Sequence, residues 1–185
     1  MLIIYLSAAL ALILLSYIVF QRIVRKDYLE KGRLSFLSYM LEFVVFALHA
    51  NFIYVYIPVT WPRLPVFPEE PVLNIVSKIL LYTGLIIVII AMTGLGIGRT
   101  MGQDRKRLKK SGLYLYSRNP QVIGYALMLI AVFLFYPSVY AFGWLVIFAI
   151  MISFMINVEE EFLLKTYGNA YRAYCRKVPR FFRIS

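Results

Sequence analysis

The sequence predicts an all-α protein, a polytopic membrane bundle of about five transmembrane helices that form a single domain over residues 1–185. Of the 185 residues, 62% are hydrophobic and 17% are aromatic, which is too apolar for an ordinary soluble domain. The apolar residues are also gathered into runs that approach the roughly 20 helical residues needed to cross a bilayer core of about 30 Å. Composition and run length together therefore predict an integral membrane protein.

Three apolar runs, residues 1–20, 36–57 and 72–98, each predict one membrane-spanning helix. No positively charged segment precedes the first run, so we expect a spanning helix there rather than a cleaved signal peptide. A further apolar region, residues 120–156, is interrupted at residues 136–138 by Tyr-Pro-Ser. This interruption predicts a tight hairpin of two helices, each about 26 Å long at a rise of 1.5 Å per residue.

The basic residues predict the orientation in the membrane. Of the 20 Lys and Arg residues, 18 lie in segments 21–35 and 99–119 or after residue 157. By the positive-inside rule these segments are expected in the cytoplasm, with the N-terminus outside and the C-terminus inside. The net charge of +11 could also indicate a nucleic-acid partner, but basic residues between apolar runs are explained more simply by anionic lipid headgroups. We therefore expect the bilayer, and no nucleic acid, as their partner.

A polar stretch at residues 111–124, called the first polar block below, separates two apolar runs. Asn119 is a good helix N-cap and Pro120 a good first helical residue, so a helix is expected to begin at Pro120. The unpaired amides of its first turn and the neighbouring Arg118 could together hold a carboxylate or a phosphate. Arg118 could equally be one more interfacial cation that contacts lipid phosphate.

Three consecutive carboxylates, beginning at Glu159, open a second polar block at residues 159–180. Gly168 predicts a helix break, and tyrosines recur around it at helical spacing, namely Tyr167, Tyr171 and Tyr174. The carboxylates of Glu159 and Glu160 could bind a cation, or could form only local salt bridges with Arg172, Arg176 or Lys177. The tyrosines could flank a ligand, or could form only an interfacial aromatic belt.

Two further groups of residues lie inside the predicted spans. Glu42 and His49 are seven residues apart, on nearly one helical face, and ionisable groups inside a membrane suggest function. For His49, which is expected in the outer half of the membrane, we favour a packing role, whereas Glu42 could be structural or functional. Gly94, Gly96 and Gly98 end the third span, where they could allow close helix packing or let a cofactor lie against the backbone.

The two polar blocks are expected on the same cytoplasmic face. They would offer an anion site at Arg118, a cation site at Glu159 and Glu160, and aromatic surface between the two sites. A zwitterionic amino-acid cofactor fits this arrangement. S-adenosyl-L-methionine has a carboxylate, an ammonium, a sulfonium and an adenine ring, each with a complementary group here. We therefore expect this cofactor, and no metal site.

Residues 94–182 resemble a family of membrane-embedded methyltransferases that includes isoprenylcysteine carboxyl methyltransferase and the phospholipid N-methyltransferases. The first block is similar to the family pattern Gly-x-Tyr, then Arg-His-Pro-x-Tyr-x-Gly, here Gly112-Leu113-Tyr114 and Arg118-Asn119-Pro120-Gln121-Val122-Ile123-Gly124. The second is similar to Glu-Glu, Tyr-Gly-x-x-Tyr-x-x-Tyr and Val-Pro, here Glu159-Glu160, Tyr167-Gly168, Tyr171, Tyr174 and Val178-Pro179. Asn119 stands where the prenylcysteine branch usually has histidine, and Val122 stands where tyrosine is usual.

The resemblance implies a cofactor-binding core at residues 94–182 that encloses S-adenosylmethionine. Its binding residues would be Gly94, Gly96, Gly98, Tyr114, Arg118, Asn119, Pro120, Glu159, Glu160, Tyr171 and Tyr174. The implied activity is methyl transfer to a lipid-borne acceptor, with Arg118 as a catalytic residue and Glu42 as the residue that could be a base. A nicotinamide-dependent membrane reductase of the sterol or steroid type, which shares a similar C-terminal layout, and a non-catalytic lipid-binding protein are the alternatives.

As acceptor we expect a carboxylate on a lipid-modified molecule. The basic face draws anions, and a carboxylate is already deprotonated near pH 7, whereas an amine must first lose a proton. The amide of Asn119 cannot titrate as histidine does, so the departure from the prenylcysteine pattern leaves the acceptor open. Phospholipid N-methylation is the alternative reaction.

Overall fold

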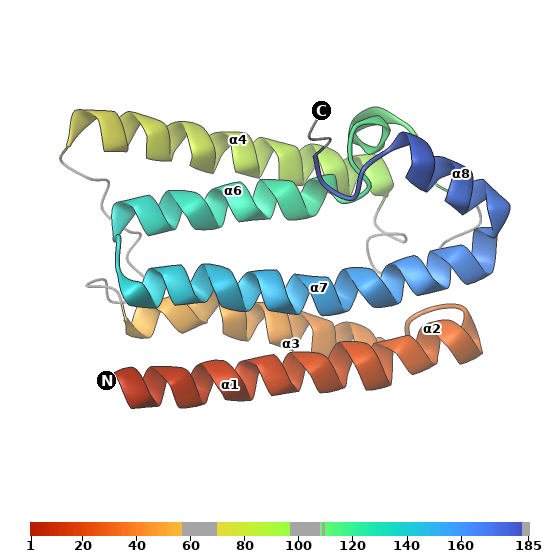
Figure 1. Cartoon of the computed structure of the whole chain (residues 1–185), viewed down its shortest axis with the longest axis horizontal. Coiled ribbons are helices and arrows are strands. Elements are labelled where there is room, and N and C mark those ends of the chain that lie inside the picture. Colours follow the sequence, from red (N-terminus) through yellow and green to blue (C-terminus); the bar gives the residue numbers. More distant parts are fainter. Residues whose placement is uncertain (57–69, 97–107, 109, 183–185) are drawn as a thin grey trace.

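The computed structural model describes residues 1–56, 70–96, 108 and 110–182. In these residues every regular element is a helix. Long helices that follow one another in the chain run in opposite directions, and together they form a bundle (Figure 1). Four helical segments are long and apolar enough to cross a membrane, at Leu2–Lys31, Phe36–Val55, Pro71–Leu95 and Val139–Tyr167. The expected all-α membrane bundle is therefore confirmed.

The first spanning segment consists of α1 (Leu2–Ile18), a π-helical turn η1 (Val19–Val24) and α2 (Arg25–Lys31). It is longer than the predicted run 1–20 because the basic residues after Phe20 continue the helix. The second contains α3 (Phe36–Phe52), followed by a short turn η2 (Ile53–Val55), and the third is α4 (Pro71–Leu95). The first spanning segment and α3 therefore form an antiparallel pair.

The predicted hairpin is confirmed. Helix α6 (Pro120–Phe135) and helix α7 (Val139–Tyr167) are antiparallel and are joined by three residues. Ser138 ends this connection as the N-cap of α7, because its hydroxyl oxygen accepts a hydrogen bond of 3.1 Å from the backbone N–H of Ala141. With 16 residues, α6 is shorter than the four spanning segments, and α7 continues beyond residue 156 to Tyr167.

The core of the bundle lies between α1, α3 and α7, and a second buried cluster joins α6 to α7. Helix α4 packs mainly on α6, at a crossing where two glycines meet. A Cβ atom added at Gly124 would lie 2.6 Å from the carbonyl oxygen of Gly84, and one added at Gly84 would come closer still to the carbonyl oxygen of Gly124. Only glycine allows these two backbones to approach so closely.

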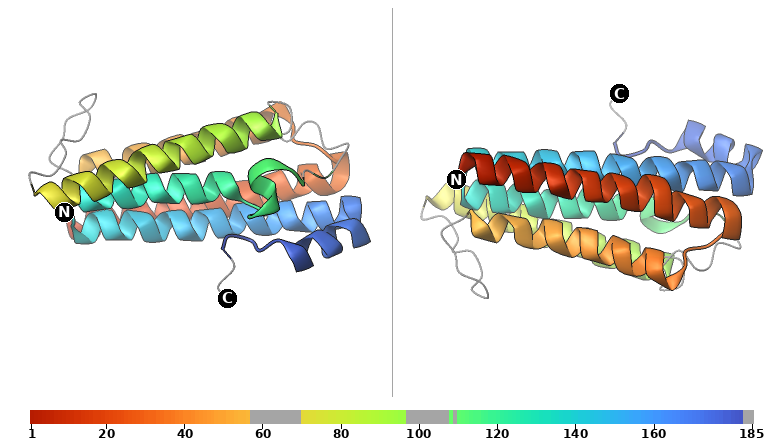
Figure 2. Two further views of the ribbon diagram at one scale, coloured as in Figure 1. Left: turned by 90° about the horizontal axis from the view of Figure 1, so that it is seen from above. Right: turned by 90° about the horizontal axis from the view of Figure 1, so that it is seen from below.

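Three short elements lie at one end of the bundle. Helix α2, the 3-10 turn η3 (Gly112–Leu115) and helix α8 (Asn169–Lys177) all lie there, in each of the views (Figures 1 and 2). The N-terminus lies at the opposite end (Figure 1). The prediction that both polar blocks share one face of the bundle is therefore confirmed.

Candidate functional site

The first polar block leads into α6, which begins at Pro120 as expected, with Asn119 at the N-cap position. The expectation that the side chain of Asn119 caps α6 is wrong. Its amide nitrogen Nδ2 instead donates a hydrogen bond of 3.2 Å to the carbonyl oxygen of Arg180. The backbone N–H of Asn119 donates to Ser117 Oγ at 3.1 Å. Asn119 therefore joins the two polar blocks rather than closing the end of its own helix.

Residues 179–180 lie against the start of α6. The backbone N–H of Arg118 donates to the carbonyl oxygen of Pro179 at 3.0 Å, and the Ser117 hydroxyl donates to the carbonyl oxygen of Arg180 at 3.1 Å. With the bond from Asn119, three consecutive residues of the first block bind two consecutive carbonyls of the second. This connection fixes the distance between the two blocks.

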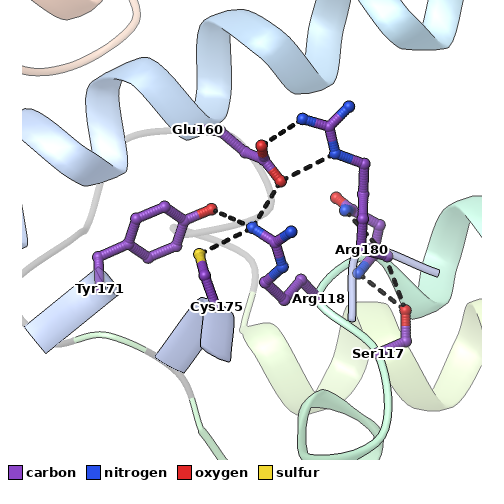
Figure 3. A network of polar contacts seen from close by, with 7 residues as sticks. Ser117, Arg118, Glu160, Tyr171, Cys175 and Arg180 are labelled. Carbon is purple, nitrogen blue, oxygen red and sulfur yellow. Dashed lines mark hydrogen bonds and ion pairs between the residues drawn. The ribbon is translucent and has the colours of Figure 1, made fainter. Parts of the chain in front are cut away.

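Arg118 lies at the centre of a polar network (Figure 3). Its guanidinium Nη1 is 2.7 Å from Glu160 Oε1, and it donates to the hydroxyl of Tyr171 at 3.2 Å and to the sulfur of Cys175 at 2.9 Å. Burial lowers the pKa of Arg118 but the charge of Glu160 raises it, and the net pKa is raised. Arg118 is therefore cationic at every physiological pH.

Glu160 is shared between two arginines. Besides its ion pair with Arg118, its two carboxylate oxygens accept hydrogen bonds from Nε and Nη2 of Arg180. The side chains of Arg118 and Glu160 are 14% and 19% exposed, so the pair is largely shielded from water. The predicted anion site and cation site are thus in direct contact, whereas the sequence suggested aromatic surface between them. Glu160 thus pairs with Arg118 and Arg180, instead of the local partners Arg172, Arg176 or Lys177 that were considered from the sequence.

The tyrosines of α8 are buried rather than spread along a membrane interface. Tyr171 and Tyr174 are 4% and 6% exposed and pack together with Val178. The Tyr174 hydroxyl donates to the backbone carbonyl of Tyr114 at 2.6 Å, and burial raises the pKa of Tyr174 to about 12. Burial also raises the pKa of Tyr171. Both phenols therefore stay protonated, with the hydroxyl of Tyr174 donating to Tyr114 and that of Tyr171 accepting from Arg118. An aromatic belt does not describe these two residues.

A cavity of about 500 Å³ lies between α3, α4, α6 and α7, next to this network. The part of its wall near η3 is polar and includes the side chains of Glu42, Tyr114, Gln121 and Glu159, which can form hydrogen bonds with a ligand. Deeper between the helices the wall is apolar and contains Phe46, Ala47, Ala50, Phe148 and Ile152. The volume is typical of a small-molecule site, and the wall is amphipathic along its length.

Tyr114 and Gln121 form a hydrogen-bonded pair in this wall. The hydroxyl of Tyr114 donates to Gln121 Oε1 at 3.0 Å. Burial, and then the negative charge of Glu159, raise the pKa of Tyr114, so the phenol remains a donor. The sequence analysis assigned no role to Gln121, although a polar residue in the first turn of a membrane helix could have drawn attention to it.

Glu42 and Glu159 come from α3 and α7, which are far apart in sequence, and both line the cavity. Glu159 and Glu160 point in different directions because consecutive residues of an α-helix are about 100° apart. Of the two predicted cation-binding residues, Glu159 therefore belongs to the cavity and Glu160 to the arginine network.

His49 packs as predicted. It is fully buried and its ring stacks on Trp144 with a centroid distance of 5.2 Å. The Trp144 indole N–H donates to the carbonyl oxygen of His49 at 2.7 Å, and His49 Nε2 is 3.2 Å from the carbonyl oxygen of Trp144. These reciprocal contacts join α3 to α7 away from both polar blocks.

Among the described residues, no close helix contact is found at Gly94 or Gly96. A Cβ atom added at either glycine would meet no described atom within 4 Å. Gly96 has a positive φ of 87° and forms the C-cap of α4, which explains a glycine at that position. Gly98 lies outside the described residues.

Comparison with known proteins identifies the family. A sequence model described as phospholipid methyltransferase matches residues 72–170, from the first turn of α4 into α8. No curated protein and no solved structure gives a significant match. The matched segment contains α4, the first polar block, the hairpin and most of the cavity wall, and it covers more than half of the 185 residues. The chain therefore belongs to the phospholipid methyltransferase family, as an integral membrane methyltransferase that acts on lipid.

Proposed function

We propose that the protein transfers a methyl group from S-adenosylmethionine to the amine of a lipid headgroup held in the cavity. The observation that carries this proposal is the amphipathic wall of the cavity, with Glu42 and Glu159 in its polar part and apolar side chains deeper in the membrane region. From Glu42 to Ala50 the wall of α3 extends by about 12 Å, at 1.5 Å per residue. This geometry suits a headgroup with the beginning of a hydrocarbon chain.

The arginine network supports a site for the methionine part of the cofactor. Its charges match those of a zwitterionic amino acid, since a ligand carboxylate can take the place of Glu160 on Arg118. Glu160 would then remain bound to Arg180 and could accept a hydrogen bond from the ligand ammonium. When bound, the cofactor supplies a methyl group on a sulfonium, which is a good leaving group.

Several of the other predicted cofactor residues belong to this network or to the cavity wall. Tyr114 and Glu159 lie in the cavity wall, and Tyr171 contacts Arg118 directly. The task left to the protein is to align donor and acceptor and to exclude water. This alignment can lower the activation barrier by several kcal/mol. Buried, protonated tyrosines suit that task because they hold a fixed geometry without adding charge. We include Gly94, Gly96, Gly98, Tyr174, Asn119 and Pro120 as neighbours of the cofactor.

The charges in the cavity wall favour an amine over the carboxylate acceptor expected from sequence. A carboxylate has four lone-pair sites and only accepts hydrogen bonds, so Glu42 and Glu159 can each bind an ammonium in addition to other partners. A carboxylate acceptor would donate no hydrogen bond to them and would be repelled. Glu42 can also take the proton that the amine must lose before attack. Carboxyl O-methylation is the second candidate. It is favoured by the basic residues of the two polar blocks, which would attract an anionic acceptor.

We also infer that this end of the bundle faces the cytoplasm. The basic residues of the segments at this end support that orientation under the positive-inside rule. The inner leaflet carries the anionic and amine-bearing lipids that such a face would meet.

The acceptor is tested by the alkali stability of the product. Membranes with the protein are incubated with methyl-labelled cofactor, and the extracted lipid is treated with mild alkali. We expect no labelled methanol and the label to stay on nitrogen in a non-volatile product, because an N-methyl bond resists alkali even where acyl esters of the lipid are cleaved. Release of labelled methanol would indicate a methyl ester and overturn the amine acceptor in favour of a carboxylate. Absence of labelled lipid would overturn methyl transfer itself.

The cofactor is tested by calorimetry on the purified protein. We expect S-adenosylhomocysteine to bind and NADPH not to bind, and the opposite result would favour a reductase. Arg118→Ala should weaken binding by about 1.5–3 kcal/mol, which is the range for a lost charge-assisted hydrogen bond. Unchanged affinity in this variant would contradict the assignment of Arg118 to the cofactor.

A further inference from the structure

Gln121 is the second residue of α6, directly after Pro120, and this position in the first turn places it in the cavity wall. Its Oε1 accepts the hydrogen bond from the hydroxyl of Tyr114 at 3.0 Å. A glutamine side chain ends in one acceptor oxygen and one NH₂ group with two donors. Because the oxygen is bound to Tyr114, the part of Gln121 that remains for a ligand is a hydrogen-bond donor.

Tyr114 is itself held in place, so it fixes the orientation of the amide. It is 6% exposed, and its backbone carbonyl accepts a hydrogen bond of 2.6 Å from the hydroxyl of Tyr174 in α8. The phenol is protonated, since its pKa is raised by burial and then by the charge of Glu159. In the structure the phenol donates to Oε1, and this hydrogen bond turns the NH₂ group of Gln121 away from Tyr114.

The polar part of the cavity therefore offers two kinds of contact. Glu42 and Glu159 provide acceptor oxygens for a cation, and Gln121 provides oriented N–H donors for an oxygen. A lipid headgroup that carries an ammonium and a phosphate a few bonds apart can use both. A simple long-chain amine can use only the carboxylates.

We propose that Gln121, oriented by Tyr114, is the residue that selects a zwitterionic headgroup by donating hydrogen bonds to its phosphate oxygen. This inference rests on the proposed lipid-amine acceptor and adds the contact that distinguishes a phosphate-bearing amine from other amines. Tyr114 acts as a positioning residue, because its effect on the acceptor passes through the amide of Gln121.

Two single-chain probes that differ in the phosphate test this assignment, namely dodecylphosphoethanolamine and dodecylamine. Their equilibrium affinities are measured on the whole protein in detergent, without cofactor and with S-adenosylhomocysteine, for the wild type, Gln121→Glu, Gln121→Ala and Tyr114→Phe. Gln121→Glu keeps the size of the side chain and removes both N–H donors. The dodecylamine probe serves as the internal control for folding and for the apolar part of the site.

We expect the wild type to bind dodecylphosphoethanolamine at least about tenfold more tightly than dodecylamine, as one hydrogen bond to a charged group implies. Gln121→Glu and Gln121→Ala should lose this ratio while their affinity for dodecylamine is unchanged or higher. Tyr114→Phe should reduce the ratio by about threefold, since the amide remains but is free to rotate. A damaged fold would lower both affinities and leave the ratio as it was.

A wild-type ratio near one, or a wild-type ratio retained in both Gln121 variants, would overturn the assignment. Should the glutamate variant fail to fold, the ratio in Gln121→Ala and Tyr114→Phe decides. The ratio is a binding measurement and needs no methyl transfer. A failure of the proposed reaction, seen as absence of labelled lipid in the wild type, is therefore distinguishable from a failure of this inference.

Discussion

Glu159 and Glu160 are adjacent in α7 but belong to two different sites, because Glu159 lines the cavity and Glu160 is bound by Arg118 and Arg180. We predict that Glu160→Gln lowers the free energy of unfolding by about 1–3 kcal/mol, since two arginines lose their charged partner. Glu159→Gln should reduce the rate of methyl transfer with a smaller loss of stability. Thermal unfolding in detergent and single-turnover methyl transfer measure the two effects.

The isosteric pair of variants is its own control, because both remove one negative charge from neighbouring positions of the same helix. Equal losses of stability in the two variants would contradict the separation of the two sites.

The glycine contact between α4 and α6 makes a second prediction. Gly124→Ala should destabilise the bundle by about 1–3 kcal/mol, the usual range for forcing extra atoms into a packed interface. The added Cβ atom would lie 2.6 Å from the carbonyl oxygen of Gly84 and would push the two helices apart. Gly94→Ala is the matched control on α4, because no described atom lies within 4 Å of its added Cβ atom. It should be neutral or stabilising by up to about 1 kcal/mol. Similar melting temperatures for the two variants would contradict the close contact.

Cys175 provides a chemical probe of the arginine network. Its sulfur lies 2.9 Å from Nη1 of Arg118, and it is the one cysteine of the sequence. We expect a maleimide at Cys175 to abolish cofactor binding, because the adduct would occupy the space beside the guanidinium. S-adenosylhomocysteine should slow the modification, as followed by mass spectrometry.

Cys175→Ser is the control for this experiment, and it should remain active and insensitive to the reagent. If the modified protein binds the cofactor as tightly as the unmodified protein, the network is not part of the cofactor site.

The orientation gives a prediction that needs no purified enzyme. Helix α3 ends and helix α4 begins at the end of the bundle opposite to α8 (Figure 1). A single cysteine introduced at Arg63, in a Cys175→Ser background, should react in intact cells with a membrane-impermeant thiol reagent, whereas native Cys175 should react only after permeabilisation. The reverse labelling pattern would place the two polar blocks outside the cell.

The sequence was sufficient to predict the parts of the fold that local chemistry determines. Pro120 begins α6, the residues at 136–138 make the hairpin, and Gly168 ends α7, because proline and glycine act on the backbone within one or two residues. The crossing of Gly84 with Gly124 was not predictable in the same way. A single glycine in an apolar run does not reveal which helix it will meet.

The candidate site was predicted in its composition but not in its arrangement. The motifs identified Arg118, Tyr114 and Glu160, yet only the contact of residues 179–180 with the start of α6 brings Arg180 to Glu160. Glu42 and Glu159 line one cavity because α3 and α7 both contribute to its wall. No spacing in the sequence indicates that these two helices would do so. Gln121 depends in turn on Tyr114, which becomes buried only in the folded chain.

The carbonyl groups of Pro179 and Arg180, which bind Ser117, Arg118 and Asn119, also bear on how the enzyme is made. All the spanning helices precede these residues in the order of synthesis. The two polar blocks can therefore join only after residues 179–180 have left the ribosome. A chain truncated just before Val178 would hold every spanning helix and still lack the carbonyl groups that join its two polar blocks.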